Sequence, residues 1–588
     1  MTSNLGQIPN WDLTDFYQNI KDKKIIQELD FVEKSLEEFS KNYQDKITKL
    51  SAKELLEAIK EYEKISEIIG KLSSYSYLIY ASDLSNQANI SFYQNISEKL
   101  NDFSTKVIFF TLEINKISDK NLDSLLIDKN LAKYQPFIRD IRAFKKYELS
   151  AELEKFSLEK SITSSNAFVR FFDETISNLE FTFDRKTLNN QEIFDLLSSP
   201  DEKIRKKSAK AIGKTFAQNA KTFAFITNVL AKDKSIDDKW RGFENPISSR
   251  NLDNFVEDEV VELLCSKVKE NYKNISHRYY KIKAKTLGKK KLNYWDRNAP
   301  LTKSNKLTKW SDARDLVLDA YQEFSPKLSE IGKIFFDKNW IDAKVVKGKD
   351  SGAFSHSTVP CVHPYILMNY QGKTRDIMTL AHELGHGVHQ YLARKQGCLM
   401  AGTPLTLAET ASVFGEQLTF QKILKNEKDE KLKKLIIAEK IEDMINTVVR
   451  QIAFLEFEKK VHNARKNGEI SLEKLCEFWM EIQKESLGDI FKFDEEYKYF
   501  WCYIPHFIHS PFYVYSYAFG DCLVNSLYGI YKSGEIGNFE EKYLQMLESG
   551  GTKHHSDLLA PFNIKISDPK FWQAGLDVII DYINQLEA

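Results

Sequence analysis

The fold is decided by the stretch Thr379-Leu-Ala-His-Glu-Leu-Gly-His-Gly-Val-His-Gln-Tyr-Leu392. Within it, His382 and His386 lie four residues apart, with Glu383 directly after the first histidine. The apolar residues around them recur at helical spacing, which predicts an α-helix that Thr374 or Asp376 can cap. On one face of a helix two such imidazoles can bind a single metal ion, so the pattern is typical of a zinc site with its own general base.

A catalytic zinc site needs a third protein ligand. His389 is excluded by distance, because seven residues of helix rise about 10 Å, whereas nitrogens bound to one zinc lie within about 4 Å of each other. The better candidate is Glu409, in the helical segment Leu407-Ala-Glu-Thr-Ala-Ser-Val-Phe414. A second helix antiparallel to the first would present Glu409 to both histidines. Glu416, seven residues on, either accepts a hydrogen bond from a ligand histidine or forms a surface ion pair; the sequence leaves both open.

These segments together resemble the thimet oligopeptidase family of metallopeptidases, and within it the oligoendopeptidase F branch. Further matches are the following stretches: Trp11–Tyr17, Gly352–Phe354, Pro364–Asn369 and Pro511–Tyr517. The resemblance spans nearly the whole chain. It implies that His382, His386 and Glu409 hold one Zn²⁺ per chain, that Glu383 is the base, and that a helical two-lobed shell around a deep channel admits short unfolded oligopeptides for internal cleavage.

Composition predicts a mainly α protein, because Gly (23) and Pro (13) are scarce in 588 residues. Formal net charge is zero, which gives no support for a nucleic-acid or anionic-membrane partner. The long uncharged run from Tyr499 to Gly520 contains two prolines and is expected to be a buried or cavity-lining segment rather than a membrane span. No signal peptide is recognised and the cysteines are scattered, so we expect a cytoplasmic protein with free thiols. The sequence leaves the oligomeric state open, with a monomer favoured.

Two domains are expected: residues 1–200 as an N-terminal helical lobe, and residues 201–588 as the catalytic domain. Between 340 and 370 the pattern changes to short strands, at 343–347, 352–357 and 365–370, separated by Gly, Pro and Ser. We expect this small sheet to lie beside the zinc helix. Gly352 and Ala353 at its edge are candidates for binding an extended peptide main chain to main chain; packing under the helix is the alternative.

A last cluster runs from His506 to Tyr517. Ser510 and Pro511 predict a helix start, which would place Tyr513 and Tyr517 on one face. His and Tyr side chains can donate hydrogen bonds to the oxyanion that forms in amide hydrolysis. The resemblance implies one such His and one such Tyr in this region; His509 and Tyr517 are the chosen catalytic pair, with His506 and Tyr513 as substrate-binding candidates.

Two other functions remain open from the sequence. A zinc carboxypeptidase or aminopeptidase on a similar helical fold would share the motif, but it would need a charged group for a substrate terminus, and the sequence identifies none. A helical scaffold without activity would not need the intact set of His382, Glu383, His386 and Glu409.

Overall fold

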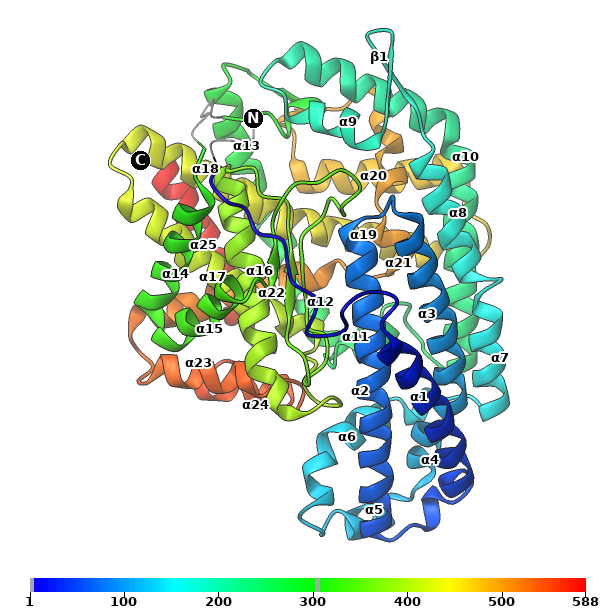
Figure 1. The fold of residues 1–588 in the computed structure, drawn as a ribbon. Helices are drawn as coiled ribbons and strands as arrows, with labels where there is room; N and C mark the ends of the chain where they lie inside the picture. The colour runs from blue at the N-terminus through cyan, green and yellow to red at the C-terminus, as the bar shows by residue number, and fades with distance from the viewer. Residues whose placement is uncertain (1–4, 302–306) are drawn as a thin grey trace. The chain divides into compact units, whose positions relative to one another are not determined.

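A computed structural model describes residues 5–301 and 307–588. The described chain is mainly α-helical with three small sheets, so the predicted fold class is confirmed (Figure 1). It divides into two compact units, each assembled from three stretches of chain. The domain boundary at residue 200 stays a prediction of the sequence.

The first unit takes Met1–Ala151, Lys306–Asn426 and Gly534–Ile564. Its helices and strands are α1 (Lys23–Tyr43), α2 (Ala52–Ser82), α3 (Gln87–Val107), α4 (Phe109–Lys116), α5 (Asp119–Leu125), α6 (Gln135–Ala143), α14 (Trp310–Phe324), α15 (Pro326–Asp337), β4 (Ile341–Asp342), β5 (Phe354–His356), β6 (Tyr365–Leu367), α16 (Thr374–Ala393), α17 (Leu405–Asn426), α23 (Phe539–Glu548) and α24 (His555–Leu559).

The N-terminal helices of this unit follow the amphipathic pattern of the sequence. Ser51 caps α2 and forms a reciprocal capping box with Glu54, which satisfies backbone N–H groups that the first helical turn leaves free. The apolar faces of α1 and α2 are buried, and α1, α2 and α3 lie side by side (Figure 1). Burial of these faces, rather than helix propensity, supplies most of the stability of such helices.

The three-stranded sheet has the order β4-β6-β5, with β4 parallel and β5 antiparallel to β6. The predicted second and third strands are present, but the first is Ile341–Asp342, directly before the predicted stretch 343–347. The chain leaves the strand at Ala343, whose N–H donates to the carbonyl of Pro9. Both β5 and β6 contact α16, so the sheet lies beside the predicted zinc helix, as expected.

The second unit takes Glu152–Asn305, Glu427–Ser533 and Lys565–Ala588. Its helices and strands are α7 (Ala151–Ser161), α8 (Ser165–Ser177), β1 (Phe181–Phe183), β2 (Lys186–Leu188), α9 (Asn190–Asp195), α10 (Glu202–Arg241), α11 (Ser248–Asp253), α12 (Asp258–Glu270), α13 (Ser276–Thr286), β3 (Leu292–Asn293), α18 (Glu430–Thr447), α19 (Val449–Arg465), α20 (Leu472–Leu487), β7 (Phe491–Lys492), α21 (His506–His509), α22 (Tyr515–Ser533) and α25 (Pro569–Glu587).

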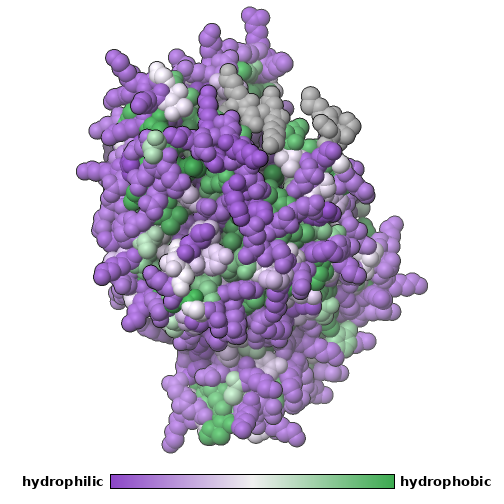
Figure 2. Space-filling model, turned by 90° about the vertical axis from the view of Figure 1, so that its left-hand side faces the viewer, coloured by the Kyte–Doolittle hydropathy of each residue, from purple (hydrophilic) through white to green (hydrophobic). Residues whose placement is uncertain are grey.

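The uncharged run that begins at Tyr499 is not one long helix. It is divided among the 3-10 helix Glu495–Tyr503, the short helix α21, and the start of α22. None of the helices in the described ranges is long and apolar enough to cross a membrane. On the face shown in Figure 2, hydrophilic residues predominate and hydrophobic residues are interspersed among them, as the 29% content of charged residues predicts.

Candidate metal centre and catalytic residues

The predicted metal-binding helix is α16, which spans the whole motif without interruption. It begins at Thr374, and the Asp376 carboxylate accepts hydrogen bonds from the backbone N–H groups of Gln371 (2.8 Å) and Lys373 (3.0 Å). A carboxylate in the first turn also complements the positive end of the helix dipole. The capped N-terminus and the buried apolar side of α16 therefore stabilise the helix that carries His382 and His386.

The second helix, α17, runs antiparallel to α16. His386 lies beside Glu409, and His382 lies beside Glu416 seven residues later, so the two helices run in opposite directions along their contact. Glycines allow the close approach: a Cβ added at Gly385 would come within 2.4 Å of the Ala411 carbonyl oxygen. The predicted antiparallel presentation of Glu409 is confirmed by this packing.

Three side chains converge at this contact. Oε2 of Glu409 lies 3.4 Å from Nε2 of His382 and 3.5 Å from Nε2 of His386, and one ligand atom from each residue lies within 4.8 Å of the others. The three side chains retain 26, 18 and 17% of their surface for His382, His386 and Glu409, so a metal ion and a water can reach them. Two imidazole nitrogens and one carboxylate oxygen form a donor set that suits zinc.

The negative charges of Glu409 and Glu416 favour a positive charge beside the imidazole of His382. Burial acts against protonation of His382, but the hydrogen bond to Glu416 and the charges of Glu409 and Glu416 raise the pKa of His382 to about 10. His386 has no such hydrogen bond to a carboxylate in the described residues, and burial lowers its pKa to about 4. The carboxylates that stabilise a proton on His382 would stabilise a divalent cation at the same place.

Glu383 lies on α16 between the two histidines in sequence and is 6% exposed. Burial raises the pKa of its carboxyl group to about 7, and the negative charge of Glu409 adds to this effect. A general base works best when its pKa lies near the working pH. Glu383 is therefore suited to accept and return a proton at neutral pH.

Glu416 is the residue whose role the sequence left open. Its Oε1 lies 2.5 Å from Nδ1 of His382. The carboxylate therefore orients the imidazole, whose other nitrogen, Nε2, is the proposed metal ligand atom.

His389, excluded as a ligand by distance, is buried on α16, and its Nε2 lies 3.3 Å from the Thr403 hydroxyl.

The sheet edge next to α16 carries the candidates Gly352 and Ala353, which directly precede β5. Gln390 of α16 accepts a hydrogen bond from the Ser355 hydroxyl (2.8 Å) and donates one to the Ser355 carbonyl (3.1 Å). These contacts join β5 to the helix of His382 and His386. Sequence reasoning missed Gln390, although it falls on the motif helix one turn after His386.

In the second unit, the structure brings together His506, Tyr513 and Tyr517. Nε2 of His506 lies 3.2 Å from the Tyr517 hydroxyl, and the Tyr513 and Tyr517 rings lie 5.2 Å apart. His509 is not in this group: it lies 2.7 Å from Asp173 and is 39% exposed.

The predicted start of the helix at Pro511 is wrong, because α22 begins at Tyr515. Phe512 has φ of +62°, a left-handed conformation that interrupts the helix before it. Tyr513 therefore lies in a turn and not one helical turn before Tyr517, although the two rings still meet.

Comparison with known proteins agrees with this geometry. The model of the family described as Peptidase family M3 matches residues 195–578, and one described as Oligopeptidase F matches residues 113–181. Oligopeptidase PepF of Bacillus subtilis is 27% identical over 98% of this chain and 86% of its own length. The oligoendopeptidase F homolog of Borreliella burgdorferi is 29% identical over 94% of each chain.

Solved structures share the fold. A crystal structure from Chlamydophila abortus covers 99% of both chains with a TM-score of 0.82 and 24% identity. Oligoendopeptidase-F from Enterococcus faecium covers 96% of this chain and 98% of its own, with a TM-score of 0.74 and 20% identity. Since the family model covers well over half of the sequence, the chain belongs to peptidase family M3, and it is a metalloendopeptidase.

Proposed function

We propose that this chain is a zinc-dependent oligoendopeptidase, with His382, His386 and Glu409 as metal ligands and Glu383 as general base. The proposal rests mainly on the convergence of one ligand atom each from His382, His386 and Glu409 within 4.8 Å of one another. Glu383 lies on α16, the same helix as the two histidines. The relatives named as oligopeptidases and oligoendopeptidases support short peptides as the substrate class.

A zinc ion held by these residues would lower the pKa of a bound water and polarise the carbonyl of the peptide bond to be cut. Glu383 would take the proton from the attacking water. The same carboxyl group would then give that proton to the nitrogen of the departing amine, so one residue serves as base and then as acid. Burial favours this exchange, because it raises the pKa of Glu383 to about 7.

The donors for the reacting carbonyl oxygen are proposed to be a histidine and a tyrosine of the 506–517 cluster. Tyr517 is retained from the sequence prediction. Because the Tyr517 hydroxyl lies 3.2 Å from Nε2 of His506, we place His506, rather than His509, with it. With the N–H at Nε2 of His506 donating to the Tyr517 oxygen, the single hydroxyl proton of Tyr517 can donate to the reacting carbonyl oxygen.

The edge of β5 is proposed to bind the substrate main chain. In an antiparallel pair alternate residues direct their backbone groups away from the partner strand, so Ser355 and Ala353 share one edge. Gln390 already occupies the Ser355 carbonyl. The Gly352 N–H donates to Asp350 and its carbonyl accepts from Asn369, so Gly352 shapes this edge and the backbone of Ala353 is proposed to meet an extended peptide. Recognition through main-chain groups would accept peptides of many sequences.

The setting is proposed to be the cytoplasm, and the working form a monomer. The zero net charge gives no support for nucleic acid or anionic membranes as partners. Light scattering on the purified protein tests the monomer, because a dimer would double the measured mass.

The function is tested with unstructured peptides of increasing length, digested with and without a chelator and analysed by mass spectrometry. We expect internal cuts that stop when metal is removed and return with Zn²⁺. Cuts confined to the termini would instead establish an exopeptidase.

The Glu383→Gln variant should keep its zinc, measured by elemental analysis, and lose activity by at least about 10³-fold, while a Glu427→Gln control stays active. Undiminished cleavage by Glu383→Gln would remove Glu383 as the base.

A further inference from the structure

The second unit contains a partly open cavity of about 50 Å³ that has no part in the proposed peptidase chemistry. One water needs roughly 10–15 Å³ of such space, so the cavity has room for a small ligand. Aromatic rings form most of its wall, and two arginines, Arg297 and Arg450, complete it.

Both arginines are held by neutral partners. Nη2 of Arg297 donates to Oδ1 of Asn446 at 2.5 Å, and Nη2 of Arg450 donates to the Tyr503 hydroxyl at 2.7 Å. Arg450 is also the second residue of α19, where the helix dipole adds positive potential. Burial lowers the pKa of Arg450, and the positive charge of Arg297 lowers it further. The cavity wall therefore carries two neighbouring cations in a weakly polar setting.

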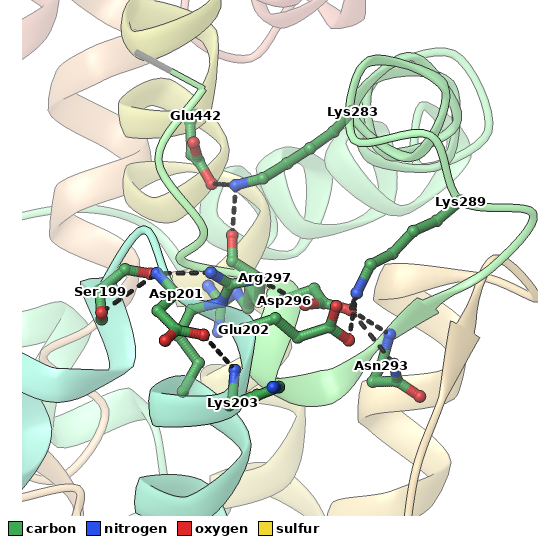
Figure 3. A network of polar contacts seen from close by, with 11 residues as sticks. Ser199, Asp201, Glu202, Lys203, Lys283, Lys289, Asn293, Asp296, Arg297 and Glu442 are labelled. Carbon is green, nitrogen blue, oxygen red and sulfur yellow. Dashed lines mark hydrogen bonds and ion pairs between the residues drawn. The ribbon is translucent and has the colours of Figure 1, made fainter. Parts of the chain in front are cut away.

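No carboxylate in the described chain forms an ion pair with Arg297 or Arg450, because the nearby acids are used by other cations. Asp296 pairs with Arg205 at 2.8 Å and with Lys289 at 2.7 Å. Figure 3 shows Asp296 facing Lys289, and the Lys283 ammonium between Glu442 and the backbone carbonyl of Arg297. The acids of this network are thus neutralised.

Two further acids, Glu496 and Asp494, lie near the cavity wall. Both pair with Lys210, at 2.5 and 2.6 Å, and Glu496 also accepts a hydrogen bond from the Tyr294 hydroxyl at 2.7 Å. The local carboxylates are therefore all engaged, and the two guanidinium charges on the cavity stay without a counter-ion among the described residues.

Donor groups at the cavity also lack acceptors. Nε of Arg297, Nε of Arg450 and Nε1 of Trp295 are buried and have no hydrogen-bond partner in the described structure, and all three residues line the cavity. Buried charges in proteins are nearly always paired, and buried N–H groups nearly always donate. Among the described residues, two guanidinium groups without a counter-ion and one indole N–H without an acceptor line one small space. Such a group of donors is suited to bind an anion.

We propose that this cavity binds a small inorganic anion of the halide class, chloride being the probe of choice, which neutralises Arg297 and Arg450 and accepts hydrogen bonds from the donors around it. The site shares no residue with the proposed metal centre. Its ligand contributes to the stability of the second unit, because an anion that binds only the folded state shifts the unfolding equilibrium by mass action.

The first test is thermal unfolding of the full-length protein at constant ionic strength, with gluconate replaced stepwise by chloride or bromide. Gluconate is too large for the cavity. We expect a saturable rise in Tm of about 2–5 °C that depends on the halide. A Tm that follows ionic strength alone, equally in every salt, overturns the proposal.

Two variants sharpen this test. Arg450→Met removes one of the unpaired charges, so its Tm should no longer respond to chloride and should equal or exceed that of the parent protein in gluconate. Arg205→Met is the control: Arg205 is buried and pairs with Asp296, so this variant should lose stability in both salts and keep its response to chloride. A chloride response that persists in Arg450→Met contradicts the assigned site.

Crystals of the unaltered protein grown in bromide provide a measurement that does not depend on the folding of any variant. An anomalous-scattering peak between the two guanidinium groups is expected. Absence of a peak there at saturating bromide overturns the proposal.

Discussion

Nδ1 of His382 lies 2.5 Å from Oε1 of Glu416, while Nε2 of the same ring lies 3.4 Å from Oε2 of Glu409. The two nitrogens of one imidazole thus face two carboxylates of α17 that are seven residues apart. This fixes the ring plane and makes Nε2 the atom that is available to a metal ion.

We therefore predict that Glu416→Ala weakens zinc binding by about 10–100-fold, because the His382 ring loses the group that orients it. Glu416→Gln should lose less, since an amide oxygen still accepts the Nδ1–H. Competition with a fluorescent chelator measures both affinities. Lys425→Ala, an exposed position at the end of the same helix, is the control and should bind zinc normally. Unchanged affinity in Glu416→Ala would remove Glu416 from the metal site.

A second prediction concerns the glycine between the histidines. In Gly385→Ala the new Cβ would lie 2.4 Å from the Ala411 carbonyl oxygen and 2.7 Å from Cα of Ser412, so α17 has to move away from α16. We expect a lower Tm and a loss of at least about 10-fold in zinc affinity, because Glu409 moves with α17.

Gly529→Ala serves as its control. Gly529 also lies inside a helix, but a Cβ there meets nothing within 4 Å. This variant should gain about 0.4–1 kcal/mol in free energy of unfolding. Wild-type zinc affinity in Gly385→Ala would show that the close helix contact does not position Glu409.

The third prediction is a pH dependence of stability caused by Glu458. This residue of α19 is buried, and its Oε1 accepts a hydrogen bond from the backbone N–H of Phe512 at 2.8 Å, whereas Oε2 has no partner in the described chain. Burial raises the pKa of Glu458 to about 8, above the ordinary value of 4.5. The folded state therefore holds a proton that the unfolded state has lost, and stability falls as pH rises from about 4.5 through 8.

Glu458→Gln removes this penalty, because the amide is neutral and keeps an oxygen for the Phe512 N–H. We expect urea unfolding at pH 9 to show a gain of about 1–3 kcal/mol over the parent protein, and almost no gain at pH 4, where Glu458 is protonated in the folded state and largely protonated in the unfolded state. The exposed Glu469→Gln should show neither effect. Equal gains at both pH values would mean that packing, and not ionisation, is responsible.

The fourth prediction separates the two histidines near Tyr517. Tyr517→Phe and His506→Gln should each lower kcat by about 10–10³-fold with a smaller change in KM, since a donor to the transition state is lost or misplaced. His509→Gln should stay within a few-fold of the parent enzyme, because His509 is paired with Asp173. The reverse order, with His509→Gln the impaired variant, would restore the sequence-based choice. Steady-state cleavage of a fluorogenic peptide measures all three.

Local periodicity is enough to predict much of this protein. A helix places residues four apart on one face, so the spacing of His382 and His386 alone assigns both to one site. Low Gly and Pro content indicates long helices, and the short runs separated by Gly, Pro and Ser around 352–370 indicate strands. These features depend only on interactions between near neighbours in sequence.

Tertiary packing decided which side chains meet, because the residues that contact each other at the site are distant in the sequence. The role of Glu416 depends on how closely α17 approaches α16, and this distance is set by the small surface of Gly385 and the backbone of Ala411. The pairing of Tyr517 with His506 depends on the left-handed turn at Phe512, which no spacing rule indicates. The sequence alone predicted the metal ligands and the base, because they lie on short helical segments with recognisable spacing. Packing between helices decided the choice of His506 over His509 and the atoms that meet, because side-chain contacts across elements depend on backbone distances that local periodicity does not encode.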